Sequence, residues 1–130
     1  MNNKIVDTQL FMESMEIERI INDIKADNVS YELNLEYYID VLDENRVVLK
    51  IACDSGFKPN LMFRAKFKYA FIIEFENDIT DEDIYANEED IFDSIGSEVS
   101  YLIAILTRNM GGSPLIVPPV VSKINRLEKK

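Results

Sequence analysis

Residues 63–75 read F-R-A-K-F-K-Y-A-F-I-I-E-F, and this stretch decides the fold class. Every second residue is apolar, and the positions between them begin with Arg64, Lys66 and Lys68. A period of two predicts a β-strand with one buried face and one face that is mostly in water. At about 3.3 Å per residue the strand would span roughly 40 Å, which is well beyond a usual strand. Such a strand must bend or lie in a large twisted sheet, and its apolar face needs a partner, so the pattern favours binding over catalysis.

The chain before the long strand predicts two more strands. The odd positions of residues 31–41 are apolar, and residues 47–53 continue with the same period after the short polar connection 43–45. Short connections between amphipathic strands predict an antiparallel meander. Residues 55–60 predict a loop that leads into the long strand.

The pattern changes to that of a helix after Phe75. Thr80 and Asp83 have the spacing of a capping box. From Glu88 onward the apolar residues recur at intervals of three and four, which predicts one principal helix with Gly96 as a candidate interruption. Gly111-Gly112 predicts the end of this helix.

The remaining segments are less regular. Residues 10–25 fit either a helical face or a strand, and periodicity leaves both open. Residues 113–121 are apolar and punctuated by proline, so we expect them to drape over the sheet instead of forming a central strand. We expect a single domain over residues 1–130, with flexible ends at 1–9 and 122–130.

The net charge of −10 is concentrated in one segment. Between Tyr69 and Thr107 there are eleven carboxylates and no Lys or Arg. This acidic field argues against nucleic acid as a partner. Two interpretations of the segment stay open: a solvated surface that prevents aggregation, and a docking surface for a basic protein partner. The docking surface would include Glu88, Glu89 and Asp90.

The available side chains argue against an enzyme. The absence of histidine removes His-based triads and metal sites, so we expect no catalytic residues, cofactor or metal. Cys53, the one cysteine, lies in the inward phase of its strand and is expected to be a packed thiol. One cysteine also fits a reducing compartment, so we expect a cytoplasmic protein. No apolar run approaches the roughly 20 residues of a membrane helix, so we expect no membrane insertion.

Several apolar residues exceed what the core requires. Adjacent Tyr37 and Tyr38 must point to opposite faces of their strand, which leaves Tyr38 on the outer face as a solvent-facing side chain or as part of a second apolar patch. We expect a peptide-binding groove close to the seam of helix and sheet. Its candidate residues are Tyr38, Ile72, Tyr85, Phe92, Tyr101 and Met110. Each of them could instead be a core or subunit contact.

The order of these parts resembles the SecB-like family of export chaperones. Residues 97–121, S-E-V-S-Y-L-I-A-I-L-T-R-N-M-G-G-S-P-L-I-V-P-P-V-V, carry the most specific likeness, a long helix, a turn of small residues and an apolar-Pro-Val ending. The positions that match are Arg108, Gly111, Pro114, Leu115, Pro119 and Val120.

The resemblance implies an α+β fold, a four-stranded antiparallel meander sheet with one principal C-terminal helix packed on one face. Residues 10–25 would form the first strand, and subunits would assemble into dimers and then a homotetramer. The resemblance also implies an ATP-independent chaperone that binds unfolded or extended polypeptides in apolar grooves, with a link to protein export. Residues 122–130 lack the Cys and His of the export chaperone's metal-binding tail, so we expect no docking to the translocation motor through such a tail.

Two further classes of function remain open. The protein could be an acidic adaptor that docks one folded basic partner, without general chaperone activity. A small-molecule-binding or hydrolytic α+β domain is the third. Binding by an acidic adaptor would depend strongly on salt, because exposed charges are screened over about 8–10 Å, whereas binding in apolar grooves would not.

Overall fold

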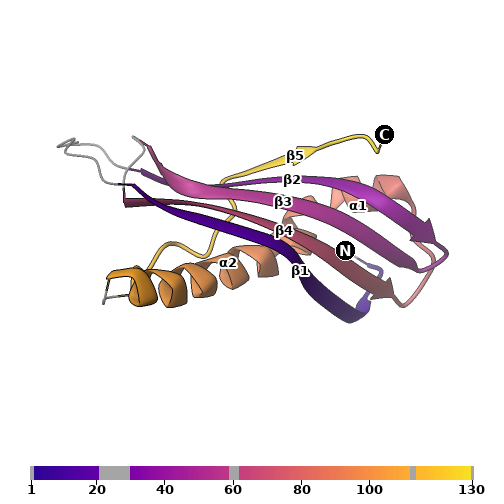
Figure 1. Ribbon diagram of the computed structural model, residues 1–130. Helices are drawn as coiled ribbons and strands as arrows, with labels where there is room; N and C mark the ends of the chain where they lie inside the picture. The colour runs from indigo at the N-terminus through magenta and orange to yellow at the C-terminus, as the bar shows by residue number, and fades with distance from the viewer. Residues whose placement is uncertain (1, 21–29, 59–61, 112–113, 130) are drawn as a thin grey trace.

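The computed structural model describes residues 2–20, 30–58, 62–111 and 114–129. These residues form one sheet and two helices, with both helices on the same side of the sheet (Figure 1). The strands are β1 (Ile5–Ile20), β2 (Ser30–Asp43), β3 (Arg46–Lys58), β4 (Met62–Phe75) and β5 (Lys123–Arg126), and the helices are α1 (Asp81–Ala86) and α2 (Glu88–Gly111). The strand order is β1-β4-β3-β2-β5. The expected α+β class with one principal C-terminal helix is confirmed, but the described sheet has five strands instead of the expected four, and β5 is parallel to β2.

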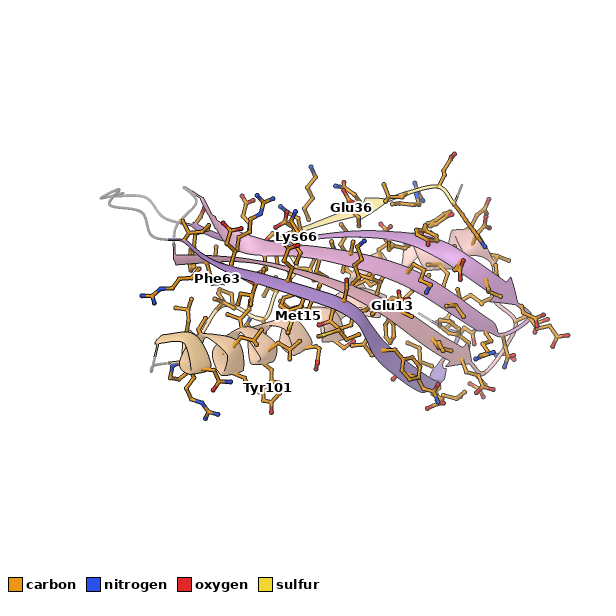
Figure 2. The ribbon with its side chains drawn as sticks, viewed as in Figure 1. Glu13, Met15, Glu36, Phe63, Lys66 and Tyr101 are labelled. Atoms are coloured by element: carbon orange, nitrogen blue, oxygen red, sulfur yellow. The ribbon has the colours of Figure 1, made fainter. Side chains whose placement is uncertain are left out.

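Strand β4 lies within the sheet, between β1 and β3, and its alternation has the predicted phase. Figure 2 shows Phe63 pointing toward the helix layer and Lys66 on the opposite side of the sheet. The buried residues of β4 are Phe63, Ala65, Phe67, Tyr69, Phe71, Ile73 and Phe75. On the exposed face, Arg64 Nη2 lies 2.7 Å from Asp54 Oδ2 of β3.

Strand β1 pairs with β4 and not with β2, so the meander is limited to β2, β3 and β4. The strand interpretation of residues 10–25 is confirmed up to Ile20, while residues 21–25 lie outside the described part. The expectation of a flexible segment at 1–9 is wrong for residues 5–9, because their backbone pairs with the end of β4. One extra residue between Met12 and Ser14 forms a bulge that breaks the alternation.

The hairpin between β2 and β3 turns at Glu44 and Asn45, as the short connection predicted. Glu44 has a φ of 54°, and the Asn45 side-chain amide donates to the Phe75 carbonyl at 2.8 Å. The loop predicted at 55–60 starts too early, because β3 continues to Lys58. Ser55 can remain in the strand because its buried hydroxyl shares a 2.7 Å hydrogen bond with the Tyr31 hydroxyl.

The helical region begins as predicted, but its interruption lies at Asn87 instead of at Gly96. The capping box of Thr80 and Asp83 opens α1, and the chain restarts at Glu88 after Asn87. Gly96 lies inside α2 without interrupting it. A Cβ atom at Gly96 would lie 2.6 Å from the carbonyl oxygen of Pro119, so this glycine allows residues 114–129, which we call the C-terminal segment, to cross the helix closely.

The C-terminal segment packs on α2 instead of draping over the sheet. The Ser100 hydroxyl donates to the Val117 carbonyl at 2.8 Å, and the Leu115 amide donates to Thr107 Oγ1 at 2.8 Å. The expectation of a flexible segment at 122–130 is not met by residues 123–126, which form β5 parallel to β2, and residue 130 lies outside the described part of the chain. No proline follows Pro119, so every amide after it can donate to a neighbouring strand.

Candidate peptide-binding surface

Strand β1 is an edge strand with exposed apolar side chains. Within the described ranges it pairs with β4 alone, so the other side of its backbone is unpaired. Met12 lies opposite Tyr69 and Met15 opposite Phe67, so both methionines are on the face that α2 covers farther along the sheet. Tyr69 and Phe67 are buried, yet Met12 is 41% exposed and Met15 46%. The helix layer therefore ends before it reaches β1.

Helix α2 also carries apolar residues on one of its flanks. The C-terminal segment occupies the flank that carries Gly96, Ser100 and Thr107 and then leads to β5, at the far edge of the sheet from β1. With 3.6 residues per turn, Tyr101 and Ile105 lie on the opposite flank. Tyr101 is 63% exposed and points away from the sheet, while Met15 extends from β1 on the helix side (Figure 2). We call Met12, Met15, Ile17, Tyr101, Leu102 and Ile105 the open-edge surface.

A buried hydroxyl lies beside this surface. Tyr69 Oη is the one buried side-chain polar atom without a hydrogen-bond partner among the described residues. Burial raises the pKa of Tyr69, and the nearby Cys53 and Glu98 raise it further. The hydroxyl therefore remains neutral and keeps its proton as an unused donor behind Met12.

The opposite edge of the sheet holds an acidic cleft of about 520 Å³. It lies between the start of α2 and the C-terminal segment, and it is lined by Glu88, Glu89, Phe92, Asp93, Val120, Val121, Ser122, Lys123 and Ile124. Glu88 accepts a hydrogen bond from the Tyr37 hydroxyl. Burial and this hydrogen bond raise the pKa of Tyr37, so the tyrosine remains a donor.

The arrangement of strands and helices is similar to that of a protein of known structure. No protein-family model matches the chain, and neither does any curated protein. A similar solved structure is the SecB-like chaperone Rv1957 of Mycobacterium tuberculosis, in complex with a ChAD peptide from the HigA1 antitoxin Rv1956. The match covers 88% of each chain with a TM-score of 0.62 and 20% sequence identity. The chain has a SecB-like fold. The resemblance given by residues 97–121 is thus confirmed at the level of the fold.

In this SecB-like fold the predicted groove residues do not come together. Tyr38 and Ile72 are half-buried on the outer face of the sheet, but β3 separates their strands. Tyr85 lies on α1, where its ring stacks under the Arg126 guanidinium, 4.0 Å from the ring centroid. Phe92 is buried, with its ring centroid 4.6 Å from that of Tyr37.

The remaining predicted residues divide between the two edges of the sheet. Tyr101 belongs to the open-edge surface, and the side chain of Met110 lies outside the described part of the chain. Glu88 and Glu89 line the acidic cleft, and Asp90 is exposed beside them.

The expected burial of Cys53 is confirmed. The thiol is buried in the sheet, and burial raises its pKa to about 12. A thiol with such a pKa stays protonated at neutral pH and is a poor nucleophile. In the described residues, no three His, Cys, Asp or Glu side chains are grouped as metal ligands. No described helix is both long and apolar enough to cross a membrane.

Sequence reasoning did not assign the methionines of β1 to a binding surface. Leu10 and Met12 on one side of the bulge, and Met15 and Ile17 on the other, each keep a period of two. The extra residue between the two pairs shifts their phase by one. A search that allowed a single insertion would have found the strand and its apolar face.

Proposed function

We propose that the protein is an ATP-independent chaperone that binds unfolded or extended polypeptide segments on the open-edge surface. The observation that carries the proposal is the apolar inward face of β1, which α2 leaves uncovered. Large exposed apolar surfaces mark binding sites in folded proteins. The peptide-bound state of the SecB-like neighbour supports the same interpretation.

The chemistry of β1 suits an extended client. The unpaired N–H and C=O groups along its edge can pair with a client backbone in any sequence context. Met12 and Met15 are flexible and polarizable, so they adapt to client side chains of different shapes. Neither contact requires a cofactor or a nucleotide.

Apolar side chains away from β1 should drive self-association. We predict a dimer or a dimer of dimers, in line with the homotetramer that the family resemblance implies, because a monomer leaves Tyr101 exposed and Tyr38 and Ile72 half-exposed. Static light scattering at micromolar concentration measures the mass directly. A monomeric mass at that concentration would contradict the prediction.

The acidic segment favours a second candidate function, an adaptor that docks one basic partner. Asp81, Glu82, Asp83, Glu89 and Asp90 are all exposed near the start of the two helices. Binding through these groups would weaken strongly with salt, since exposed charges are screened.

Aggregation suppression at low and high salt separates the two functions. The purified protein is mixed with an unrelated polypeptide that unfolds on heating, and light scattering follows its aggregation. The chaperone proposal expects suppression that persists at high salt, because apolar burial does not depend on screening. No suppression at either salt concentration would overturn it and is the result expected of an adaptor without general chaperone activity. Suppression that high salt abolishes would also contradict it, because charged groups and not the apolar surface would then hold the polypeptide.

The proposal also covers the cellular compartment of the protein and the class of its clients. We assign the protein to the cytoplasm, on the basis of its single buried thiol, and its clients to exported chains or to one dedicated partner. Purification of the protein with its bound chains, followed by mass spectrometry, would distinguish these two client classes.

A further inference from the structure

The C-terminal segment packs on α2 in its first half and pairs with the edge of β2 in its second. Val117 is buried against α2, and Pro119 crosses the helix at Gly96 in close contact. Residues 122–129, which we call the strap, lie on the outer edge of β2 instead. Their ladder with β2 spans four residues and is parallel, the slightly weaker form of strand pairing.

Backbone hydrogen bonds at its two ends fix the strap on β2. The Ser122 amide donates to the Leu33 carbonyl at 2.8 Å, and the Leu127 amide donates to the Tyr37 carbonyl at 2.7 Å. The Leu33 amide in turn donates to Ser122 Oγ at 3.0 Å. The strap therefore occupies β2 in the way that a bound extended peptide would.

The strap is basic, and the surface beneath it is acidic. Lys129 Nζ lies 3.0 Å from Asp40 Oδ1, and Lys123 lines the cleft together with Glu88 and Glu89. Arg126 stacks over the Tyr85 ring, an aromatic platform for a cation. The part of the acidic segment at the start of α2 thus faces basic residues of its own chain.

We propose that the strap is an intramolecular ligand of a site for a basic, extended peptide segment of a partner protein. The partner segment would displace the strap, add to the edge of β2, and place its cations at Tyr85, the acidic cleft and Asp40. This site lies at the opposite edge of the sheet from the open-edge surface, so it stands independently of the chaperone proposal.

The strap makes the site self-inhibited. A peptide in trans binds only the fraction of molecules whose strap has left β2, and its apparent dissociation constant rises in inverse proportion to that fraction. If the strap occupies the site nine-tenths of the time, its release should tighten peptide binding about tenfold.

A labelled peptide with the sequence of the strap, S-K-I-N-R-L-E-K, tests the proposal by fluorescence anisotropy on the full chain. The release variant is Arg126→Ala with Lys129→Ala, which removes two cations of the strap and leaves the acidic surface unchanged. Its control is Lys66→Ala with Lys68→Ala, since these exposed cations on the outer face of β4 give the same change in net charge.

We expect the release variant to bind the peptide about tenfold more tightly than the wild type, and the control to bind it as the wild type does. A peptide with glutamate in place of its three cations should not bind. Faster hydrogen exchange at the Ser122 and Leu127 amides verifies release, while protected amides in β4 verify the fold. If these two amides stay protected, Ser122→Pro removes one donor and serves as the second release variant.

Faster exchange at these amides without tighter binding would overturn the proposal, as would equal binding of the acidic peptide. A mass of the release variant above that of the wild type at the same concentration would identify a second copy of the chain as the occupant, and it would overturn the proposal as well. Aggregation suppression is measured separately, so either proposal can fail without the other.

Discussion

The two edges of the sheet differ in what covers them. At the β2 edge, Leu35 and Tyr37 point inward and are fully buried, and the chain's own β5 pairs with the backbone. At the β1 edge, Met12 and Met15 also point inward, but nearly half of each side chain is exposed. The same strand phase therefore gives a core at one edge and an open surface at the other. The position of α2 and of the C-terminal segment makes the difference.

The edges also differ in chemistry. The covered edge combines acidic residues of α2 with basic residues of the strap, whereas the helix-side face of the open edge is mainly apolar. A segment held by exposed charges can be displaced by another charged segment or by salt. An open apolar face instead suits partners that bring their own apolar side chains. Under the two proposals, the covered edge would therefore select basic segments, and the open edge would accept varied apolar ones.

The largest loss of unfolding free energy is expected from a substitution in the middle of the sheet, between the two edges. Phe71→Ala removes a buried aromatic ring between sheet and helix and should cost about 3–5 kcal/mol of unfolding free energy. Urea denaturation measures this change. The control Arg64→Ala, on the exposed face of the same strand, should cost less than about 1 kcal/mol. Equal losses in the two variants would mean that the assigned strand phase is wrong.

The crossing at Gly96 should be the next most sensitive point, because it holds the segment that leads to the covered edge. In Gly96→Ala the new Cβ meets a backbone carbonyl at 2.6 Å, and such overpacking costs about 1–3 kcal/mol. The gain in helix propensity, about 1 kcal/mol, offsets part of that cost.

We therefore expect Gly96→Ala to lower the unfolding free energy and to speed hydrogen exchange at the Leu115 amide. The neighbouring exposed position provides the control, Ser97→Ala, with a change within about 0.5 kcal/mol. A Gly96→Ala protein more stable than the wild type would show that the C-terminal segment is not held at this crossing.

The smallest expected effect compares one substitution at both edges. Arg126→Ala removes the cation from the Tyr85 ring and should cost about 0.5–1 kcal/mol, the usual range for an exposed cation–π contact. Arg19→Ala, at an exposed position of β1, should change stability by less than about 0.5 kcal/mol. Thermal unfolding of the two variants side by side measures the difference. A larger loss of stability in Arg19→Ala than in Arg126→Ala would contradict the distinction between a covered and an open edge.

The sequence predicted the elements whose local signals are strong. The alternation of Phe63 to Phe75 gave both the strand and its buried face, because a half-buried strand requires that period. Thr80 and Asp83 identified the start of α1, since a capping box satisfies two backbone donors within four residues.

Two features could not be predicted, because they depend on distant partners. The bulge after Met12 disrupts the period of β1, and pairing with β4 decides that the segment is a strand. Lys123 to Arg126 have no strand pattern of their own, and β2 offers them an unpaired edge. The candidate groove failed to assemble for the same reason, since β3 separates Tyr38 from Ile72.

The most direct test of the chaperone proposal replaces Met12 and Met15 with glutamine and measures the suppression of aggregation of an unfolding polypeptide. The matched control replaces Val41 and Leu42 with glutamine, because these residues are 48% and 37% exposed at the end of the β2–β3 hairpin. With unfolding free energies within about 0.5 kcal/mol of the wild type, we predict that Met12→Gln/Met15→Gln loses most of the suppression and that the control retains it. Full suppression by the methionine variant would contradict the proposal that the open edge binds the client.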